Sequence, residues 1–149
     1  MAGAAGYHSL GTWEFLVDAD DPSVVAFMEV NARVQVEHTV TEQVTGIDLV
    51  QAQLQVADGA TLHDLGLTQD HVPVPRGYAV QVRVNTETMT AEGLARPAGG
   101  TMTTFEVPTG PGIRIDTYGY AGYTTSPSFD SLLAKVVGHS PAPRYGEAV

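Results

Sequence analysis

A row of polar side chains alternates with apolar ones in the sequence FMEVNARVQVEHTVTEQVTG, which begins at Phe27. The row consists of two carboxylates, two amides and one guanidinium: Glu29, Asn31, Arg33, Gln35 and Glu37. Because successive side chains of a β-strand point to opposite faces, the alternation predicts that all of them share one face. The commoner interpretation is a sheet with one wet face, but no lysine, serine or threonine interrupts this row.

A metal site is predicted where the row meets the preceding segment. Glu14 lies in TWEFLV, residues 12–17, which the sequence predicts to pair with the segment around Glu29 as a β-hairpin. Two carboxylates about 4 Å apart repel by about 4 kcal/mol at an effective dielectric of about 20, and a divalent cation removes that repulsion. The oxygens of Glu14, Glu29 and Asn31 suit Mg²⁺ or Mn²⁺. The alternative is a solvated hairpin.

The same row supplies a candidate general base. Glu37 follows Arg33 by four residues, and a nearby guanidinium favours the charged form of a carboxylate, which can then accept a proton. Arg83, on the polar side of a later strand, is a second arginine for the same cleft. The alternative interpretations are a structural ion pair and a solvated strand arginine.

The elements that would position these side chains are a β-hairpin, then helices, then a β-rich half, which is an α+β layout. Thr39 and Glu42 have capping-box spacing and predict a short helix. Asp48 predicts the start of a second helix, which stops at Gly59. Beyond the prolines of VPVPRG, the segments YAVQVRVN, GTMTTFEV, GIRIDTY and SLLAKVV are predicted to be strands.

The composition excludes several classes of function. The chain has 17 acidic and seven basic residues and a net charge of −10, so no general nucleic-acid or anionic-membrane binder is expected. It has no cysteine, which excludes a disulfide framework and a thiolate metal site. Neither a membrane span nor a secretory signal is predicted, and the cytoplasm is the expected compartment.

The segment from Phe27 to Gly59 closely resembles the biotin carboxylases, which occur as subunits or domains of acetyl-CoA, propionyl-CoA and pyruvate carboxylases. Its E-V-N-x-R part fits any ATP-grasp ligase, whereas the continuation R-x-Q-V-E-H-x-V-T-E is characteristic of the biotin-dependent branch. The segments AGYHSLGTWEFLVD, RGYAVQVRVNTE and GPGIRIDTYGYAGYTTSPSFDSLLAKVV resemble the family too. Nearly the whole chain is covered.

The resemblance implies an α+β fold in two parts. Residues 1–70 would be the end of an ATP-grasp domain, a β-hairpin plus helices, and residues 71–149 a truncated, β-rich biotin carboxylase C-terminal domain. The implied cofactors are ATP, Mg²⁺ or Mn²⁺, and biotin as carboxyl acceptor. The implied partners are bicarbonate, a biotin carboxyl carrier protein or domain and a carboxyltransferase component, with a homodimer as one expected assembly.

The resemblance also implies roles for residues near the nucleotide. Glu14 and Glu29 would bridge the metal and Asn31 would complete its site. Leu16 would lie near the adenine.

Other residues would form the bicarbonate and biotin pocket: Arg33, Gln35, Val36 and Glu37. Glu37 would be the base that activates bicarbonate. Arg83 would bind near the ureido oxygen of biotin and stabilise its enolate. The family reaction takes ATP and bicarbonate to carboxyphosphate and then transfers the carboxyl group to N1 of biotin.

The sequence also departs from the family. A biotin carboxylase has a Rossmann-like N-terminal domain and a glycine-rich lid with several lysines, whereas this chain has one lysine, Lys135. We therefore expect a piece of the enzyme that is inactive alone. Two alternatives remain: a non-catalytic module that binds a carboxylase partner through sheet edges, and another ATP-grasp ligase, such as a carbamoyl-phosphate synthase relative.

Overall fold

The computed structural model describes the backbone of residues 1–149 and their side chains except that of residue 147. The chain forms two compact units, Met1–Pro75 and Arg76–Val149. The predicted assignment of residues 1–70 and 71–149 to two domains stays a prediction.

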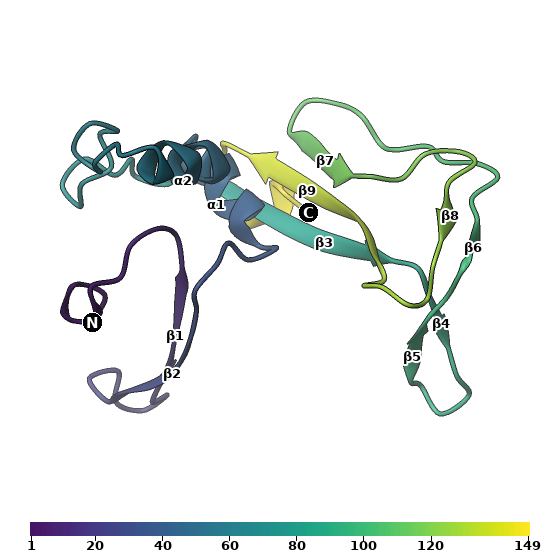
Figure 1. Ribbon diagram of the computed structural model, residues 1–149, viewed down its shortest axis with the longest axis horizontal. Helices are drawn as coiled ribbons and strands as arrows, with labels where there is room; N and C mark the ends of the chain where they lie inside the picture. Colours follow the sequence, from purple (N-terminus) through teal and green to yellow (C-terminus); the bar gives the residue numbers. More distant parts are fainter. The chain divides into compact units, whose positions relative to one another are not determined.

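The first unit contains a hairpin followed by two helices (Figure 1). Its elements are a 3-10 turn (Gly3–Ala5), β1 (Thr12–Val17), β2 (Val25–Asn31), α1 (His38–Thr45) and α2 (Leu49–Ala57). Of the helices that the structure describes, none has the length and apolar character that crossing a bilayer requires.

The second unit is built almost entirely of strands, as the sequence predicts. Its elements are β3 (Tyr78–Asn85), β4 (Glu87–Met89), β5 (Ala95–Pro97), β6 (Gly100–Thr101), β7 (Ile113–Thr117), β8 (Thr124–Thr125), β9 (Leu132–Ser140) and a 3-10 turn (Tyr145–Glu147).

The predicted hairpin of β1 and β2 forms, and β1 has the predicted bounds, residues 12–17. The two strands pair antiparallel, with Glu14 opposite Glu29. The register shifts after Glu14, so that Phe15 lies opposite Phe27 and Met28 has no opposite residue. Such a β-bulge adds one residue to one strand and bends it locally. The aromatic rings of Phe15 and Phe27 then meet edge to face, 5.7 Å apart.

The predicted polar row does not continue along one strand, so this prediction is wrong. β2 ends at Asn31, because the backbone N–H of Arg33 donates to the Asn31 carbonyl at 2.8 Å and turns the chain. The guanidinium of Arg33 donates to the carbonyl of Val34 at 3.1 Å and holds the turn. A local turn therefore overrides the alternation, and the last three polar residues of the row lie beyond the strand.

The predicted capping pair of the first helix is also wrong. The N-cap of α1 is Glu37, which makes no side-chain cap hydrogen bond, and Thr39 lies inside the helix and is buried. The carboxylate of Glu42 instead accepts from the backbone N–H of Leu49 at 2.8 Å, at the first turn of α2. Because that partner lies seven residues away, local spacing does not reveal it.

The remaining helix ends follow the predictions. Asp48 is the N-cap of α2, and its Oδ1 accepts from the backbone N–H of Gln51 at 2.8 Å. α2 ends at Ala57, two residues before Gly59. α1 ends at Thr45, and its C-cap Gly46 has a φ of 76°, the left-handed conformation that glycine adopts most easily.

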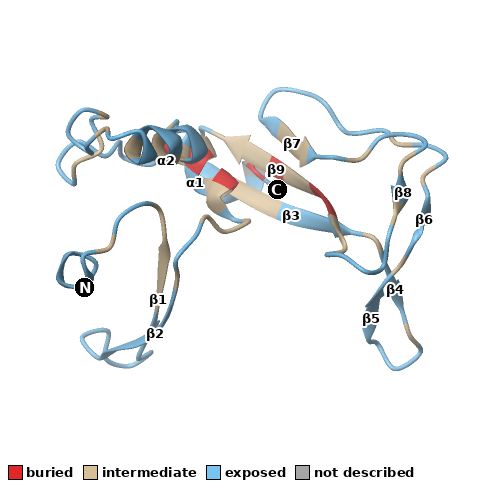
Figure 2. Ribbon diagram, in the orientation of Figure 1, coloured by how far each residue is buried: buried red, intermediate tan, exposed pale blue. Residues whose placement is uncertain are grey.

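A three-stranded antiparallel sheet in the order β3-β9-β7 holds the core of the second unit. β3 coincides with the predicted segment YAVQVRVN. The central strand β9 hydrogen-bonds to both neighbours, and Leu133, Ala134 and Val137 on it are buried, with Val137 at 0% exposure (Figure 2). An apolar strand that is covered on both edges is what a run such as LLAKVV favours.

Two short ribbons, β4–β5 and β6–β8, follow the end of the sheet in Figure 1. The predicted strand GTMTTFEV is reduced to the two residues of β6. Across this ribbon the hydroxyls of Thr101 and Thr124 lie 2.8 Å apart. Exposed threonines without apolar alternation give a longer strand little to bury.

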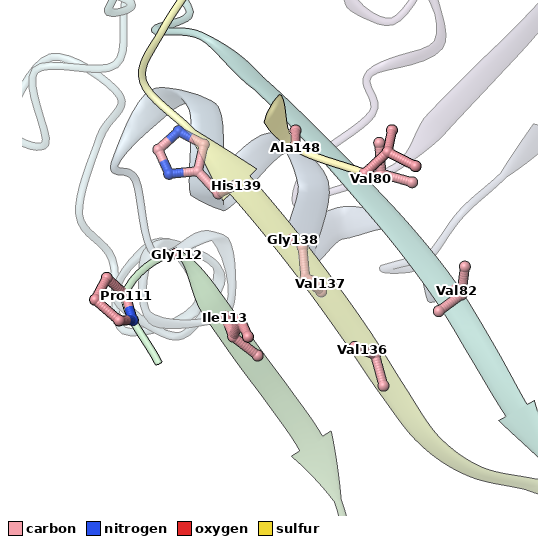
Figure 3. Close-up of a pocket in the computed structure, with 11 residues that line it drawn as sticks. Val80, Val82, Pro111, Gly112, Ile113, Val136, Val137, Gly138, His139 and Ala148 are labelled. Atoms are coloured by element: carbon pink, nitrogen blue, oxygen red, sulfur yellow. The ribbon is translucent and has the colours of Figure 1, made fainter. Parts of the chain in front are cut away.

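One face of the sheet carries an apolar hollow of about 350 Å³. Figure 3 shows Val82, Val136 and Ile113 on three neighbouring strands around it, with Ala148 beside them. The polar side chain in its lining is that of His139, whose Nε2 lies 3.1 Å from a backbone carbonyl. This lining does not suit a charged substrate such as ATP or bicarbonate.

Val137 tests the importance of the central strand. Val137→Ala removes two buried methyl groups, and we expect it to lower the free energy of unfolding by about 2 kcal/mol. Val82→Ala, at a position that is 54% exposed in the same sheet, is the control and should cost less than about 1 kcal/mol. Urea denaturation followed by circular dichroism measures both, and equal losses would contradict this view of the core.

Candidate functional site

Two carboxylates and an amide meet on one side of the hairpin. Glu14 and Glu29 are cross-strand partners. The Nδ2 of Asn31 donates to Glu14 Oε1 at 3.1 Å and to Glu29 Oε1 at 3.0 Å. One nitrogen can reach both carboxylates only if the two glutamates lie on the same side of the hairpin. The arrangement that a shared cation requires is therefore present, and the role of these residues as ligands stays a prediction.

The donor set fits a hard divalent cation. The Asn31 amide lies between the two carboxylates, where a partial positive charge relieves their repulsion. Turning that amide over would place Oδ1 there instead, which gives three oxygen donors of the kind that Mg²⁺ and Mn²⁺ prefer. Among the residues that the structure describes, no group of three or more His, Cys, Asp or Glu side chains could hold a metal, and the hairpin set has two carboxylates and an amide.

The turn after β2 brings Gln35 back to the hairpin. Its Nε2 donates to Glu14 Oε1 at 3.3 Å, across 21 positions of the sequence. The side chain of Gln35 is half-buried, whereas that of Arg33 is exposed. Gln35 therefore connects a predicted metal ligand with the predicted bicarbonate pocket.

Glu37 lies at the N-terminus of α1. It is exposed, whereas Val36 beside it is half-buried. The Nδ1 of His38 lies 2.7 Å from the carbonyl of Gln35, and this contact fixes the path of the chain into the helix. The exposed carboxylate of Glu37 is accessible to a substrate at this end of the helix. Its role as base stays a prediction.

Arg83 lies in a row of charged side chains that crosses the sheet of the second unit. The register places Lys135 opposite Arg83, and Asp116 opposite Lys135. Lys135 Nζ lies 3.0 Å from Asp116 Oδ2, and Arg114 Nε lies 2.8 Å from Asp116 Oδ1. The Asp116 carboxylate therefore pairs with two positively charged side chains, of which Lys135 lies opposite Arg83, and the side chain of Lys135 is only 11% exposed.

The ion pairs of this row shift the pKa of Asp116. Burial alone would raise its pKa, but hydrogen bonds from Arg114 and Lys135 and the positive charges of both outweigh burial and hold the pKa below the ordinary value of 3.8. Asp116 is therefore ionised at neutral pH. This cluster was not predicted from the sequence, although Arg114 and Asp116 lie two positions apart in R-I-D and so share one face of a strand.

The structure places the other predicted site residues as follows. Leu16, the residue predicted near the adenine, is on β1 and is 60% exposed, which leaves its side chain accessible to a ligand. Arg83 belongs to the second unit and Arg33 and Glu37 to the first. The meeting of these three side chains in one pocket stays a prediction.

Two family models match the chain. The carbamoyl-phosphate synthase L chain, ATP binding domain, matches residues 1–65, and the biotin carboxylase C-terminal domain matches residues 81–149. The first description alone would fit several ATP-dependent ligases, whereas the second is particular to biotin carboxylases.

Curated relatives of the chain are pyruvate carboxylases. Pyruvate carboxylase of Aspergillus terreus is 45% identical over 136 residues, which is 91% of this chain and 11% of that protein. Pyruvate carboxylase 1 of Caenorhabditis elegans is 47% identical over 138 residues, 92% of this chain and 11% of that protein. Human mitochondrial pyruvate carboxylase is 45% identical over 140 residues, 93% of this chain and 12% of that protein. The chain thus spans only 11–12% of the length of these relatives.

Solved structures give the same result. A single-chain, multi-domain long-chain acyl-CoA carboxylase matches with a TM-score of 0.89 and 43% identity, over 99% of this chain and 15% of that one. The biotin carboxylase domain of a single-chain bacterial carboxylase matches with a TM-score of 0.78 and 48% identity, over 93% of this chain and 30% of that one. The biotin carboxylase domain of a thermophilic 2-oxoglutarate carboxylase bound to bicarbonate matches with a TM-score of 0.81 and 38% identity, over 94% of this chain and 30% of that one.

These comparisons confirm the predicted fold class, the end of an ATP-grasp domain followed by a β-rich biotin carboxylase C-terminal domain. The chain belongs to the biotin carboxylase family.

The ion pairs of Asp116 predict a pH dependence of stability. Folding lowers the pKa of Asp116 below 3.8, so its contribution to stability is fully present above pH 3.8 and is lost as the pH falls through the lowered value. Asp116→Asn should therefore be less stable than the wild type at neutral pH, and the difference should shrink in acid. Urea denaturation from about pH 7 to about pH 2.5 measures this difference. Glu106→Gln, at an exposed carboxylate of the same unit, is the control. A difference that stays constant with pH would contradict the prediction.

Proposed function

We propose that this chain supplies part of the active site of a biotin carboxylase, which carboxylates biotin with bicarbonate and ATP through carboxyphosphate. The observation that supports the proposal most is the meeting of Glu14, Glu29 and Asn31, with Gln35 on the same oxygen of Glu14. A solvated hairpin has no need of two carboxylates that face each other.

In the proposed site, Glu14, Glu29 and Asn31 hold a divalent cation through their side-chain oxygens. Bound there, Mg²⁺ or Mn²⁺ would neutralise part of the phosphate charge of ATP during phosphoryl transfer. Leu16, farther along β1, supplies an exposed apolar side chain for the adenine ring.

The residues after β2 bind and activate bicarbonate in this proposal. Arg33, Gln35 and Val36 hold the anion, and Glu37 takes its proton. The bicarbonate oxygen that has lost the proton then attacks the γ-phosphorus of ATP, and the bond to the leaving ADP breaks, which yields carboxyphosphate. The exposure of Glu37, which leaves its carboxylate accessible to a substrate, supports its role as a base.

Arg83 takes part in the second half of the proposed reaction. Its guanidinium lies near the ureido oxygen of biotin and stabilises the enolate that forms when N1 becomes the nucleophile. The positively charged side chains of Arg114 and Lys135, which pair with Asp116, support this role because they add positive potential on the side of the sheet where Arg83 lies. A biotin carboxyl carrier and a carboxyltransferase are the proposed partners, in the cytoplasm.

We further propose that the chain is inactive by itself. ATP carries nearly four negative charges at neutral pH, and phosphoryl transfer needs cationic and backbone N–H groups that clamp them. This chain has a net charge of −10 and one lysine, and that lysine is paired with Asp116.

The purified chain should therefore release no ADP from ATP in the presence of bicarbonate, biotin and Mg²⁺. A coupled assay for ADP measures this. Release that depends on bicarbonate and biotin, and that Glu37→Gln abolishes, would contradict the proposal of inactivity.

Complementation tests the proposed function directly. The chain is mixed with a biotin carboxylase domain from a pyruvate carboxylase that lacks the region matching this chain. We expect ADP release that needs both pieces, bicarbonate and biotin, and that falls by about 100-fold or more in Glu37→Gln, while Glu106→Gln keeps its activity. Activity with ammonia in place of biotin would instead support another ATP-grasp ligase.

A second candidate function follows from the surface of the hairpin. Several apolar side chains there are 44–60% exposed: Phe15, Leu16, Val17, Val25, Phe27 and Met28. Such a surface is typical of a protein interface and favours a non-catalytic module that binds a carboxylase partner. Size-exclusion chromatography with a full-length biotin carboxylase tests this candidate, and separate elution at micromolar concentration would count against it.

A further inference from the structure

One carboxylate oxygen in the hairpin accepts hydrogen bonds from residues of two different proposed sites. Glu14 Oε1 accepts from Asn31 Nδ2 at 3.1 Å and from Gln35 Nε2 at 3.3 Å. Asn31 belongs to the proposed metal site, whereas Gln35 belongs to the proposed bicarbonate pocket. The two sites therefore share an atom.

A cation cannot occupy the place between the carboxylates while both amides remain as they are. A carboxylate oxygen has two lone pairs, and on Glu14 Oε1 both are used by N–H donors. Asn31 Nδ2 lies between this oxygen and Glu29 Oε1, where a shared cation would bind. A cation there takes a lone pair from Glu14 Oε1 and repels the N–H groups that point at the same oxygen.

Of the two donors, Gln35 is the one that can leave. Asn31 can turn its amide over and stay as a ligand through Oδ1, whereas Gln35 has the longer hydrogen bond to Glu14. The side chain of Gln35 is half-buried, so water can replace Glu14 as its partner.

We infer that Gln35 is a positioning residue that couples cation binding to bicarbonate binding. Without a cation it holds Glu14, and once a cation has displaced it, its N–H groups are available to bicarbonate. By linkage, bicarbonate that captures Gln35 also strengthens cation binding by the same factor. The inference rests on the proposed function, because it needs Glu14 as a ligand and Gln35 in the bicarbonate pocket.

The side-chain amide signals of the ¹⁵N-labelled full chain test the displacement by NMR during titration with MgCl₂. We expect the Asn31 and Gln35 signals to move with one common midpoint. Movement of Asn31 without Gln35 would overturn the coupling and leave the metal site in place. If neither signal moves up to tens of millimolar Mg²⁺, the metal site itself is wrong, and the coupling with it.

The variant Gln35→Met tests the sharing of Glu14 Oε1. Methionine keeps the length of the side chain and removes the N–H donors. The midpoint of the Asn31 signal should then occur at an Mg²⁺ concentration about two- to tenfold lower, because Glu14 no longer gives up a hydrogen bond. A merely structural tether predicts the opposite, since a loosened turn would weaken cation binding. Gln55→Met, at an exposed glutamine of α2, is the matched control and should not change the midpoint.

Bicarbonate tests the linkage in the same titration. Sodium bicarbonate should lower the Mg²⁺ midpoint of the wild type by about fivefold or more relative to sodium chloride at equal concentration. In Gln35→Met this effect should fall toward the small shift that the opposite charges of the two ions produce. An undiminished bicarbonate effect in Gln35→Met would overturn the inference.

Discussion

The repulsion between Glu14 and Glu29 is the constraint on which the candidate site depends. Like charges that face each other across an antiparallel pair weaken the pairing, so these residues do not serve the stability of the hairpin. The amide of Asn31 relieves part of the repulsion by donating to both carboxylates. An interaction that opposes folding is expected where a ligand is to supply the missing charge. The turn after β2 returns Gln35 to Glu14, where its side chain donates to Oε1. The repulsion between the two carboxylates is thereby linked to the residues around Arg33.

Much of the fold could be predicted from the sequence, because the signals concerned are local. Strict alternation places β3, and the pairing of Asp48 with Gln51 starts α2. The same alternation fails after Asn31, since its period identifies a strand only while the backbone stays extended. The capping pair of α1 fails because the helix begins before Thr39, and the Glu42 carboxylate accepts from a backbone N–H at the first turn of the next helix. In both cases a specific hydrogen bond overrides a statistical preference.

The candidate site could be predicted less completely, for the same physical reason. The residue types and the side of the strand indicated an oxygen-rich metal site, and the family resemblance supplied the roles. The contact of Gln35 with Glu14 joins residues 21 positions apart, and the contact of Lys135 with Asp116 depends on the pairing of β7 with β9. Local residue spacing does not predict which distant strands pair, so the charged row beside Arg83 could be identified only from the three-dimensional structure.

The bulge in the hairpin decides whether the two carboxylates lie on the same side of the ribbon. In the half of the hairpin nearer its loop, Phe15 lies opposite Phe27, and if that register continued, Glu14 would face Met28. The extra residue shifts the other half by one, so that Glu29 arrives opposite Glu14 and on its side of the ribbon. Paired without the bulge, the same chain would place Glu29 opposite Trp13, on the far side of the ribbon from Glu14, and leave no place for an ion to be shared.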